Sequence, residues 1–347
     1  MKGCIKVRIY SYGISIELNE ALVCGASAIL GRLLSIIGKD TFTDARYYPP
    51  AGDDPEYVAR YFIFMVAIDH RTSRYRNFEG YVDGEFYHGA DLLYRLGKLK
   101  YEENPDFFSP NSMANIGIDD VKNWLRAKGR DGHDVVIWDP DVRALLLRDL
   151  GRKLVKYYGG SVLNLIKRSG GYLKNNATYG FIDRLRSFMA YSDPVEKKAY
   201  LLAKFLSRRG ILTYVDREHS EVPVDNHLTR IALRLSFIKL PEHLLEKMRK
   251  REQCTHDEDV VIRYAVRAAF KIVSKVINVD PLVLDDLLWL FGRHCCTRKN
   301  PVCVTECSGK CLSLKLCSSA CPLFNVCPSA GSEEMLDEHY YVNTYYY

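Results

Sequence analysis

The sequence predicts an all-α, mainly helical protein with one short strand at its amino-terminal end. Apolar side chains recur with helical spacing in long stretches, such as residues 18–37 and 142–158. Segments rich in proline and glycine separate these stretches, as at 47–55, and mark where helices end or begin. Residues 1–18 instead alternate between apolar and polar side chains, which is typical of a strand.

The expected helices follow one another with short connections. Pro55 stands at the first position of the helix predicted for residues 55–68, where its missing N–H costs nothing. Residues 76–97 are rich in glycine and aromatic residues, and we expect them to begin as a loop or hairpin. Further helices are predicted within 109–125, 142–158, 181–190, 195–210, 226–238, 241–251, 257–277 and 285–295.

The composition is that of an ordinary globular protein. The chain has 347 residues, of which 47% are hydrophobic and 27% charged, and it is long enough for one large or two modest domains. No run approaches eighteen consecutive apolar residues, so we predict no membrane span. The start lacks the apolar block of a signal peptide, and we therefore expect an intracellular (cytoplasmic) monomer.

Charge and cysteine are unevenly distributed. The segment 331–347 holds four acidic and no basic residues, and without it the formal charge rises from +6 to +10. That excess suits a polyanion such as nucleic acid, although a solvated surface explains it equally. Eight of the eleven cysteines lie within residues 295–327. Inside a cell such a cluster indicates a metal site, except in heat-adapted organisms, where intracellular disulfides also form.

Asp225 and a pair of lysines are the candidates for chemistry. Asp225 precedes an amphipathic helix, where a carboxylate caps free N–H groups and is also well placed to act as a catalytic acid. Lys197 and Lys198 fall in the first turn of another helix, whose dipole disfavours positive charge. A lowered pKa would give the neutral amine that forms a Schiff base, whereas two solvated surface lysines are the plain alternative.

Several segments together resemble the helix-hairpin-helix DNA glycosylase superfamily, especially endonuclease III. DPVEKKA, residues 193–199, stands where the family has its hairpin end and catalytic lysine. VPVDNHLTRIALRL, residues 222–235, is similar to the family's Val-Asp-x-His segment, whose aspartate is catalytic. PEYVARYFIFMVAIDHRT, residues 55–72, resembles the early helix that leads into the loop wedged into DNA.

The resemblance implies a two-lobed helical fold and roles for particular residues. Asp225 would be the catalytic acid. Lys197 would form the Schiff base, with Lys198 as the other choice. His70 and Arg71 would fill the gap left by an extruded base. The chain lacks the family's Gly-x-Gly hairpin, and its 28-position separation of Lys197 from Asp225 resembles the archaeal 8-oxoguanine glycosylase branch more closely.

The cysteine cluster resembles the iron–sulfur loop of these glycosylases at both ends. Cys296-x6-Cys303 and Cys321-x5-Cys327 match the family spacing, and an insertion with three further cysteines separates them. The resemblance implies a [4Fe–4S] cluster on these four thiolates, with Cys317 in place of Cys303 as a second choice. Zinc is the rival metal. Arg298 and Lys299, in the same loop, would contact DNA phosphates.

These inferences divide the chain into four parts and give one leading function. The parts are 1–54, a strand and helix; 55–294, a glycosylase-like domain; 295–330, an iron–sulfur loop; and 331–347, a disordered acidic tail. The expected function is base excision from damaged duplex DNA, with AP-lyase activity. The alternatives are a hydrolase acting on a modified nucleoside or RNA base, and a non-catalytic iron–sulfur protein that binds nucleic acid.

Overall fold

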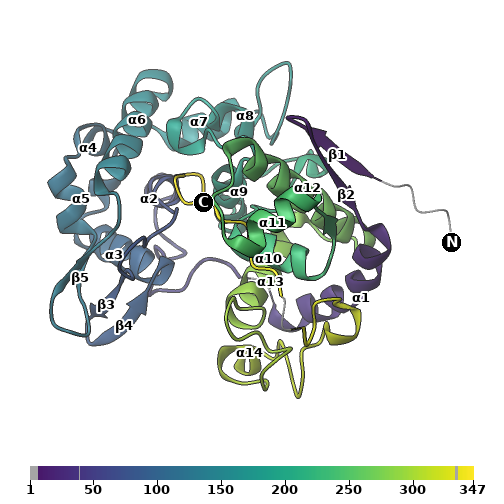
Figure 1. Ribbon diagram of the computed structural model, residues 1–347. Helices are drawn as coiled ribbons and strands as arrows, with labels where there is room; N and C mark the ends of the chain where they lie inside the picture. The colour runs from purple at the N-terminus through teal and green to yellow at the C-terminus, as the bar shows by residue number, and fades with distance from the viewer. Residues whose placement is uncertain (1–6, 39, 333–334) are drawn as a thin grey trace. The chain divides into compact units, whose positions relative to one another are not determined.

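The computed structural model describes residues 7–38, 40–332 and 335–347. These residues form two compact units (Figure 1). Unit 1 comprises Met1–Lys39 and Ser220–Asn343, and unit 2 comprises Asp40–His219 and Thr344–Tyr347. The predicted helical class is confirmed, since helices α1 to α14 make up most of the regular structure. The division differs from the predicted boundaries at 54 and 294, because unit 1 takes residues from both ends of the chain.

Unit 1 begins with a β-hairpin where one strand was expected. Strands β1 (Arg8–Ser11) and β2 (Ile14–Leu18) pair antiparallel, and β7 (Ile238–Lys239) joins the other edge of β2. Helix α1 (Glu20–Ile37) follows, with the Asn19 side chain accepting a hydrogen bond from the backbone of Leu22. This helix is long and apolar enough to cross a membrane, but here it packs against two other helices of the unit.

The remaining helices of unit 1 surround one apolar core. Helix α12 (His256–Val276) lies against α1, α10 (Asn226–Arg234) and α13 (Pro281–His294). Gly292 on α13 allows α13 to approach α10 closely, since a Cβ atom there would lie 2.7 Å from the Cβ of His227 on α10. The unit also contains α11 (Glu242–Lys250), α14 (Gly309–Ser313) and the 3-10 helix η4 (Phe324–Val326).

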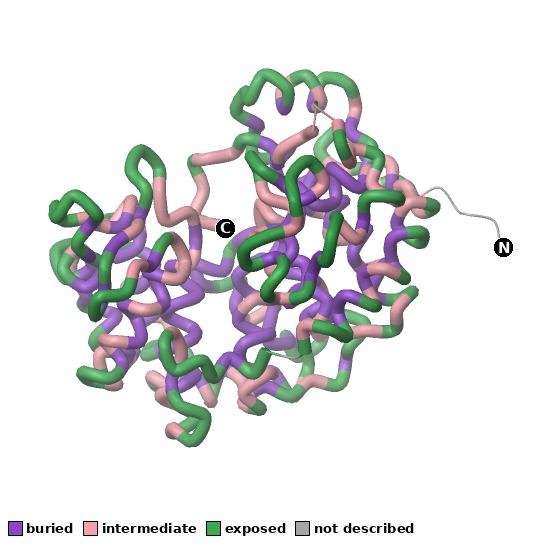
Figure 2. The backbone as a smooth tube through the Cα atoms, turned by 90° about the horizontal axis from the view of Figure 1, so that it is seen from below, coloured by how far each residue is buried: buried purple, intermediate pink, exposed green. Residues whose placement is uncertain are grey.

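Unit 2 is built around α2 (Pro55–Ala67), in which every residue from Tyr61 to Ala67 is buried. As predicted, Pro55 occupies the first turn, and the Asp54 carboxylate caps the helix. The hairpin expected after residue 76 forms as β3 and β4, and it is part of a four-stranded sheet of order β4-β3-β5-β6. Its strands are β3 (Glu79–Val82), β4 (Glu85–His88), β5 (Arg126–Lys128) and β6 (Asp134–Val136). Figure 2 shows that buried residues follow the helices, while most connecting loops are exposed.

The other helices of unit 2 agree in order with the expected ones. Residues 181–210, predicted as a helix–turn–helix pair, form a short α8, a 3-10 turn η2 and the longer α9, which begins at Lys197 rather than at 195. The helices are α3 (Ala90–Glu103), η1 (Pro105–Phe108), α4 (Pro110–Asn115), α5 (Ile118–Trp124), α6 (Pro140–Tyr158), α7 (Val162–Arg168), α8 (Phe181–Leu185), η2 (Met189–Tyr191), α9 (Lys197–Arg208) and η3 (Arg217–His219).

The carboxy-terminal segment differs from the disordered tail expected for 331–347. Its described residues from 335 onward are packed, and Glu338 and His339 are 8% and 2% exposed. The His339 ring lies 2.7 Å from the buried carboxylate of Asp259. The backbone of Cys254 donates a hydrogen bond to Tyr340. We call residues 335–340 the strap. The acidic residues of this segment led us to expect a solvated tail. In the fold, buried arginines of unit 1 form ion pairs with two of these carboxylates, so the segment can pack against the protein.

Candidate functional site

In the turn that begins helix α9, a side chain of the turn itself accepts hydrogen bonds from the free backbone N–H groups. The Asp193 carboxylate, 1% exposed, accepts hydrogen bonds from the backbone of Val195 at 3.0 Å and of Lys197 at 2.9 Å. Glu196 has a positive φ of 61° and pairs its buried carboxylate with Lys174 at 2.8 Å. An internal carboxylate therefore occupies amides at the start of this helix that would otherwise be free to bind an anion.

Lys197 and Lys198, the first two residues of α9, reach toward carbonyl groups at the carboxy-terminal end of α2. Lys198 Nζ donates to the carbonyl of Ala67 at 2.6 Å, and Lys197 Nζ lies 3.4 Å from the carbonyl of Asp69. Carbonyl groups at the end of a helix carry partial negative charge, which favours amines there. This contact between two helices compensates for the unfavourable position of the lysines at the start of α9.

A connected polar group surrounds Lys198, and we call it the lysine cluster. Lys198 Nζ lies 3.2 Å from His70 Nδ1, and His70 Nε2 lies 3.2 Å from a carboxylate oxygen of Asp139. Arg143 pairs with Asp139 at 3.1 Å and donates to the carbonyls of Ile68 and Arg71. The full cluster is Asp69, His70, Asp139, Arg143, Lys197 and Lys198.

Burial shifts the pKa values of Lys198, His70 and Asp139 in this cluster. Loss of hydration, with added repulsion from Lys197 and Arg143, holds the pKa of Lys198 well below its usual value. Loss of hydration also lowers the pKa of His70 and raises that of Asp139 to about 6. This shift favours the neutral form of Lys198, and its amine has two acceptors within reach, the Ala67 carbonyl and His70 Nδ1.

Lys197 differs from its neighbour in access. Its side chain is 9% exposed, and its amine lies 3.8 Å from the carboxylate of Asp69, which is itself partly exposed. Tyr94 donates to the same carboxylate at 3.3 Å. Lys198, by contrast, is 0% exposed and enclosed by protein. Of the two lysines, Lys197 is the more accessible, at 7% exposed against 0% for Lys198.

The structure does not place His70 where the sequence suggested. His70 is 3% exposed and bonded on both ring nitrogens, so it would have to leave the interior to fill a gap in DNA, and that role stays a prediction. Its hydrogen bonds with Asp139 and Lys198 make it part of the interior. Arg71 is partly exposed, and its backbone N–H donates to Tyr347.

Asp225 is a helix cap, as the plain interpretation expected. One carboxylate oxygen accepts hydrogen bonds from the backbone of His227 at 2.8 Å and of Leu228 at 3.0 Å. The side chain remains partly exposed, which leaves its second oxygen able to face a ligand. Asp225 belongs to unit 1 and the lysines to unit 2, so a joint role of Asp225 and Lys197 stays a prediction.

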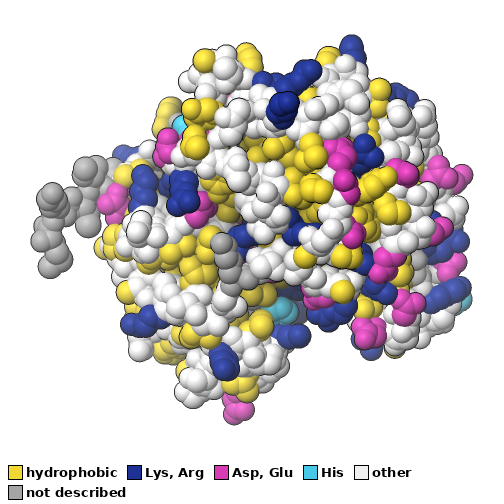
Figure 3. Space-filling view, turned by 180° about the vertical axis from the view of Figure 1, so that it is seen from behind, with side chains coloured by type: hydrophobic (Ala, Val, Ile, Leu, Met, Phe, Trp, Pro, Cys, Tyr) yellow, Lys and Arg dark blue, Asp and Glu magenta, His cyan; other side chains and the backbone are white. Residues whose placement is uncertain are grey.

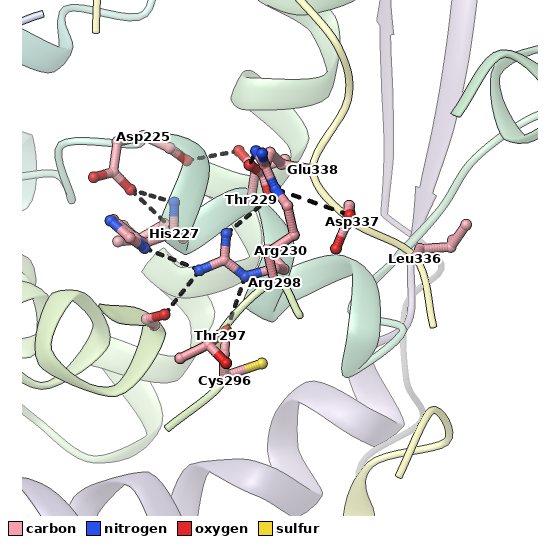
Figure 4. Close-up of polar contacts among 12 residues, drawn as sticks. Asp225, His227, Thr229, Arg230, Cys296, Thr297, Arg298, Leu336, Asp337 and Glu338 are labelled. Atoms are coloured by element: carbon pink, nitrogen blue, oxygen red, sulfur yellow. Dashed lines mark hydrogen bonds and ion pairs between the residues drawn. The ribbon is translucent and has the colours of Figure 1, made fainter. Parts of the chain in front are cut away.

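Two arginines on α10 tie this helix to the cysteine loop and the strap (Figure 4). Arg230 donates to the carbonyls of Gly292 and Cys296, to His227 Nδ1 at 2.9 Å, and to the Glu338 carboxylate at 2.7 Å. Arg234 donates to the carbonyls of Thr297, Arg298 and Leu336 and lies 3.5 Å from Cys296 Sγ. Buried arginines thus fix the start of the cysteine loop.

The eight clustered cysteines fall into two groups. Cys295 is disulfide-bonded to Cys311, and Cys307 to Cys317. The other four are free thiols that line one cavity of unit 1 together with Arg234 and Met335. They are Cys296, Cys303, Cys321 and Cys327, the same four predicted as ligands. We call them the cysteine site.

Burial governs the protonation of the cysteine site. It raises the pKa of Cys321 to about 12 and of Cys327 to about 11, with mutual repulsion among the thiolates adding to the effect. Burial also raises the pKa of Cys296, against the opposing influence of Arg234 and Arg230. Without a bound cation Cys321 and Cys327 stay protonated at neutral pH, and a cation would release their protons.

The two residues of the cysteine loop predicted to contact phosphate, Arg298 and Lys299, differ in their surroundings. Arg298 is directed to the strap, where it pairs with Glu338 and lies 3.8 Å from the Asp337 carboxylate. Lys299 is exposed. On the face shown in Figure 3, lysine and arginine side chains form several separate groups interspersed with acidic ones. The excess positive charge therefore forms no single continuous field on that face.

Sequence reasoning missed Asp139 and Arg143. The Asp139-Pro140 pair signals the start of a helix and nothing more, and Arg143 is one of several basic residues in that helix. Neither had a local pattern pointing to the interior. The two disulfides also have no signal in spacing alone, because eight cysteines permit many pairings.

Comparison with known proteins gives limited help. A scan against protein-family models finds no match, and neither does a search of the curated proteins. Among solved structures, this chain is similar to a trapped endonuclease III–DNA covalent intermediate, described as an estranged-adenine complex. The two are 14% identical, with a TM-score of 0.47, over 89% of this chain and 96% of that chain.

Proposed function

We propose that this protein is a DNA N-glycosylase with a lyase step, in which Lys197 is the nucleophile and Asp225 the supporting acid. The observation that carries the proposal is Lys197 itself. Its side chain is 9% exposed and its amine lies beside the Asp69 carboxylate, in the first turn of α9 and next to Lys198, whose pKa burial holds well below its usual value. The motif resemblance around residues 193–199 and 222–235 supports DNA as the substrate.

The reaction would begin at the anomeric carbon of a nucleotide turned out of the duplex. The Lys197 amine, freed of its extra proton by the Asp69 carboxylate, bonds to that carbon as the glycosidic bond breaks. The bond's electron pair leaves with the base, which takes up a proton. Asp225 would stabilise positive charge on the sugar. Opening of the sugar gives a Schiff base on Lys197, from which elimination breaks the strand.

Borohydride trapping on duplex DNA with one abasic site tests the nucleophile. The wild-type protein should form a covalent adduct, Lys197→Met should lose it, and Lys198→Met should keep it. Far-ultraviolet circular dichroism checks that both variants fold. An adduct that persists in Lys197→Met and disappears in folded Lys198→Met would show that Lys198 is the nucleophile and would refute the assignment to Lys197. If the wild-type protein forms no adduct, the lyase activity is refuted.

A small-nucleoside substrate is the second candidate, and one observation favours it. Asp193 satisfies the amides at the turn before α9, so this turn has less to offer a DNA phosphate than a glycine hairpin has. A hydrolase for a modified nucleoside needs no phosphate grip. Release of free base from nucleosides, with no adduct on DNA, would support this candidate over the first.

We also propose that the cysteine site holds an iron–sulfur cluster. In a zinc site the four sulfur atoms lie about 3.8 Å apart, because Zn–S bonds are about 2.3 Å long. The described residues contain no group of three or more candidate ligands close enough to hold one ion. Four free thiols around a single cavity suit a larger, polynuclear group, whose role would be to order residues 295–330.

A further inference from the structure

The strap, residues 335–340, contributes a side chain to the cysteine site. Met335 lines the same cavity as the four free thiols, and its Sδ atom lies 3.9 Å from Cys303 Sγ. The thioether of a methionine is apolar and polarisable, so it can cover a thiol without bringing water to it. The first residue of the strap therefore forms part of the wall of the cysteine site.

Ion pairs hold the middle of the strap against α10. The Glu338 carboxylate lies 2.7 Å from the guanidinium of Arg230, and the two side chains are 3% and 4% exposed (Figure 4). The Asp337 carboxylate pairs with Arg234 at 3.0 Å. Because the pair of Glu338 with Arg230 is enclosed, dissolved salt screens it much less than an exposed pair.

Arg234 joins the strap directly to the cysteine loop. Its Nε donates to the carbonyl of Leu336 at 2.9 Å, and its other nitrogens donate to the carbonyls of Thr297 and Arg298 at 2.7 and 3.1 Å. The same guanidinium lies 3.5 Å from Cys296 Sγ. Because one side chain contacts both segments, the position of the strap is coupled to that of the first thiol.

Side chains, more than backbone pairing, hold the strap in place. Residues 335–339 form neither helix nor strand, and Tyr340 makes an isolated backbone bridge with Gln253. Charges that leave a buried ion pair regain hydration, which offsets part of the attraction that is lost. The strap can therefore detach locally without the unfolding of a helix or a sheet.

We propose that the strap is a lid on the cysteine site. Met335 covers Cys303 while the lid is closed, and the ion pairs of Asp337 and Glu338 set how often the lid opens. Metal enters and leaves the site when the strap opens, and the closed strap limits the access of solvent to the bound group. The role toward metal rests on the proposed iron–sulfur cluster, whereas closure over the thiols rests on the contacts of the strap alone.

Alkylation of the thiols in metal-free protein tests the lid. Metal is removed with a chelator and without reductant, so that both disulfides stay intact, and labelling of each cysteine by N-ethylmaleimide is followed by mass spectrometry. Exposed Cys24 calibrates the reagent. Met335→Ala should label Cys303 about tenfold faster than the wild type does, since half of the contribution of a buried methionine corresponds to about that factor. Met189→Ala, at a partly buried methionine of unit 2, is the matched control and should leave the rate unchanged.

Removing an ion pair of the strap tests the same lid at a second place. Glu338→Gln should speed the labelling of Cys303 by about a hundredfold, the factor that corresponds to the loss of one partner of a buried ion pair. Glu242→Gln removes an exposed pair of the same unit and should leave the rate unchanged. Low concentrations of urea separate opening of the strap from unfolding of unit 1. Detaching the strap exposes little surface, so labelling through the lid should depend weakly on urea, whereas labelling through global unfolding rises steeply.

Two results would overturn the lid. One is a wild-type labelling rate of Cys303 in both Met335→Ala and Glu338→Gln. The other is labelling of the wild type with the steep urea dependence of global unfolding.

Loss of iron to EDTA from anaerobically reconstituted protein tests the role toward metal. Iron should leave Met335→Ala faster than it leaves the wild type, and equal rates would overturn this role. If the wild type takes up no iron, the proposed cluster fails and the role toward metal fails with it. Labelling of the metal-free thiols still decides whether the strap closes over them.

Discussion

Replacing Lys198 by Met tests whether a neutral amine lies inside unit 2. Lys198 is fully buried, and its pKa lies well below the usual value because burial removes hydration and Lys197 and Arg143 repel a second charge. In the unfolded chain the same amine titrates near 10.4. Between the two pKa values the unfolded state holds one more proton than the folded state, so the free energy of unfolding rises with pH.

The size of the effect follows from that single proton. One proton corresponds to about 1.4 kcal/mol per pH unit. Between pH 8 and 9 the wild type should therefore gain about 1.4 kcal/mol relative to Lys198→Met. His70 does not interfere, since its lowered pKa affects stability only below about 6.5. The buried thiols affect both proteins equally and cancel in the difference.

Urea denaturation followed by tryptophan fluorescence provides the assay. A Trp289→Phe background leaves Trp124 and Trp138, both in unit 2, as the reporters. Lys122→Met is the control, because the Lys122 side chain is 45% exposed and is not enclosed by protein. Equal slopes for wild type and Lys198→Met would show that Lys198 is charged in the fold, and the account of the lysine cluster would then be wrong.

Three further predictions concern the strap, the cysteine site and the α9 turn. Glu338→Gln leaves buried Arg230 without its carboxylate partner and should lower the free energy of unfolding of unit 1 by about 3 kcal/mol. Glu242→Gln removes an exposed ion pair and should change that free energy by less than about 1 kcal/mol. Similar losses in the two variants would contradict the buried pairing. Cys303→Ser should reduce iron per chain in anaerobically purified protein and Cys24→Ser should not; equal iron in both would remove Cys303 from the ligand set. Asp193→Ala should destabilise unit 2 by about 1 kcal/mol through the lost helix cap, measured by the fluorescence assay above, and an unchanged midpoint would contradict the capping role.

Features set by neighbouring residues could be predicted from the sequence. Pro55 at the start of α2 and Asp225 at the start of α10 depend only on the next few residues, and both lie as expected. The place of α9 was also predictable, because its apolar spacing is local. The short strands β5 and β6 were not, since their three residues each gain stability only from pairing within the sheet.

The contacts within the lysine cluster could not be predicted either, because they join residues that are far apart along the chain. Lys198 meets the carbonyl of Ala67 and the ring of His70, which are 131 and 128 positions away along the chain. Nothing near Lys198 distinguishes it from Lys197. The strap was missed likewise, because acidic residues look solvated until buried Arg230 and Arg234 are known to face them.

The division of the cysteines bears on how the protein should be prepared. A thiol reductant able to open Cys295–Cys311 and Cys307–Cys317 would present eight competing sulfur ligands to added iron, where the fold offers four. Samples purified with and without dithiothreitol are then chemically different materials. Metal content measured on one of them does not describe the other.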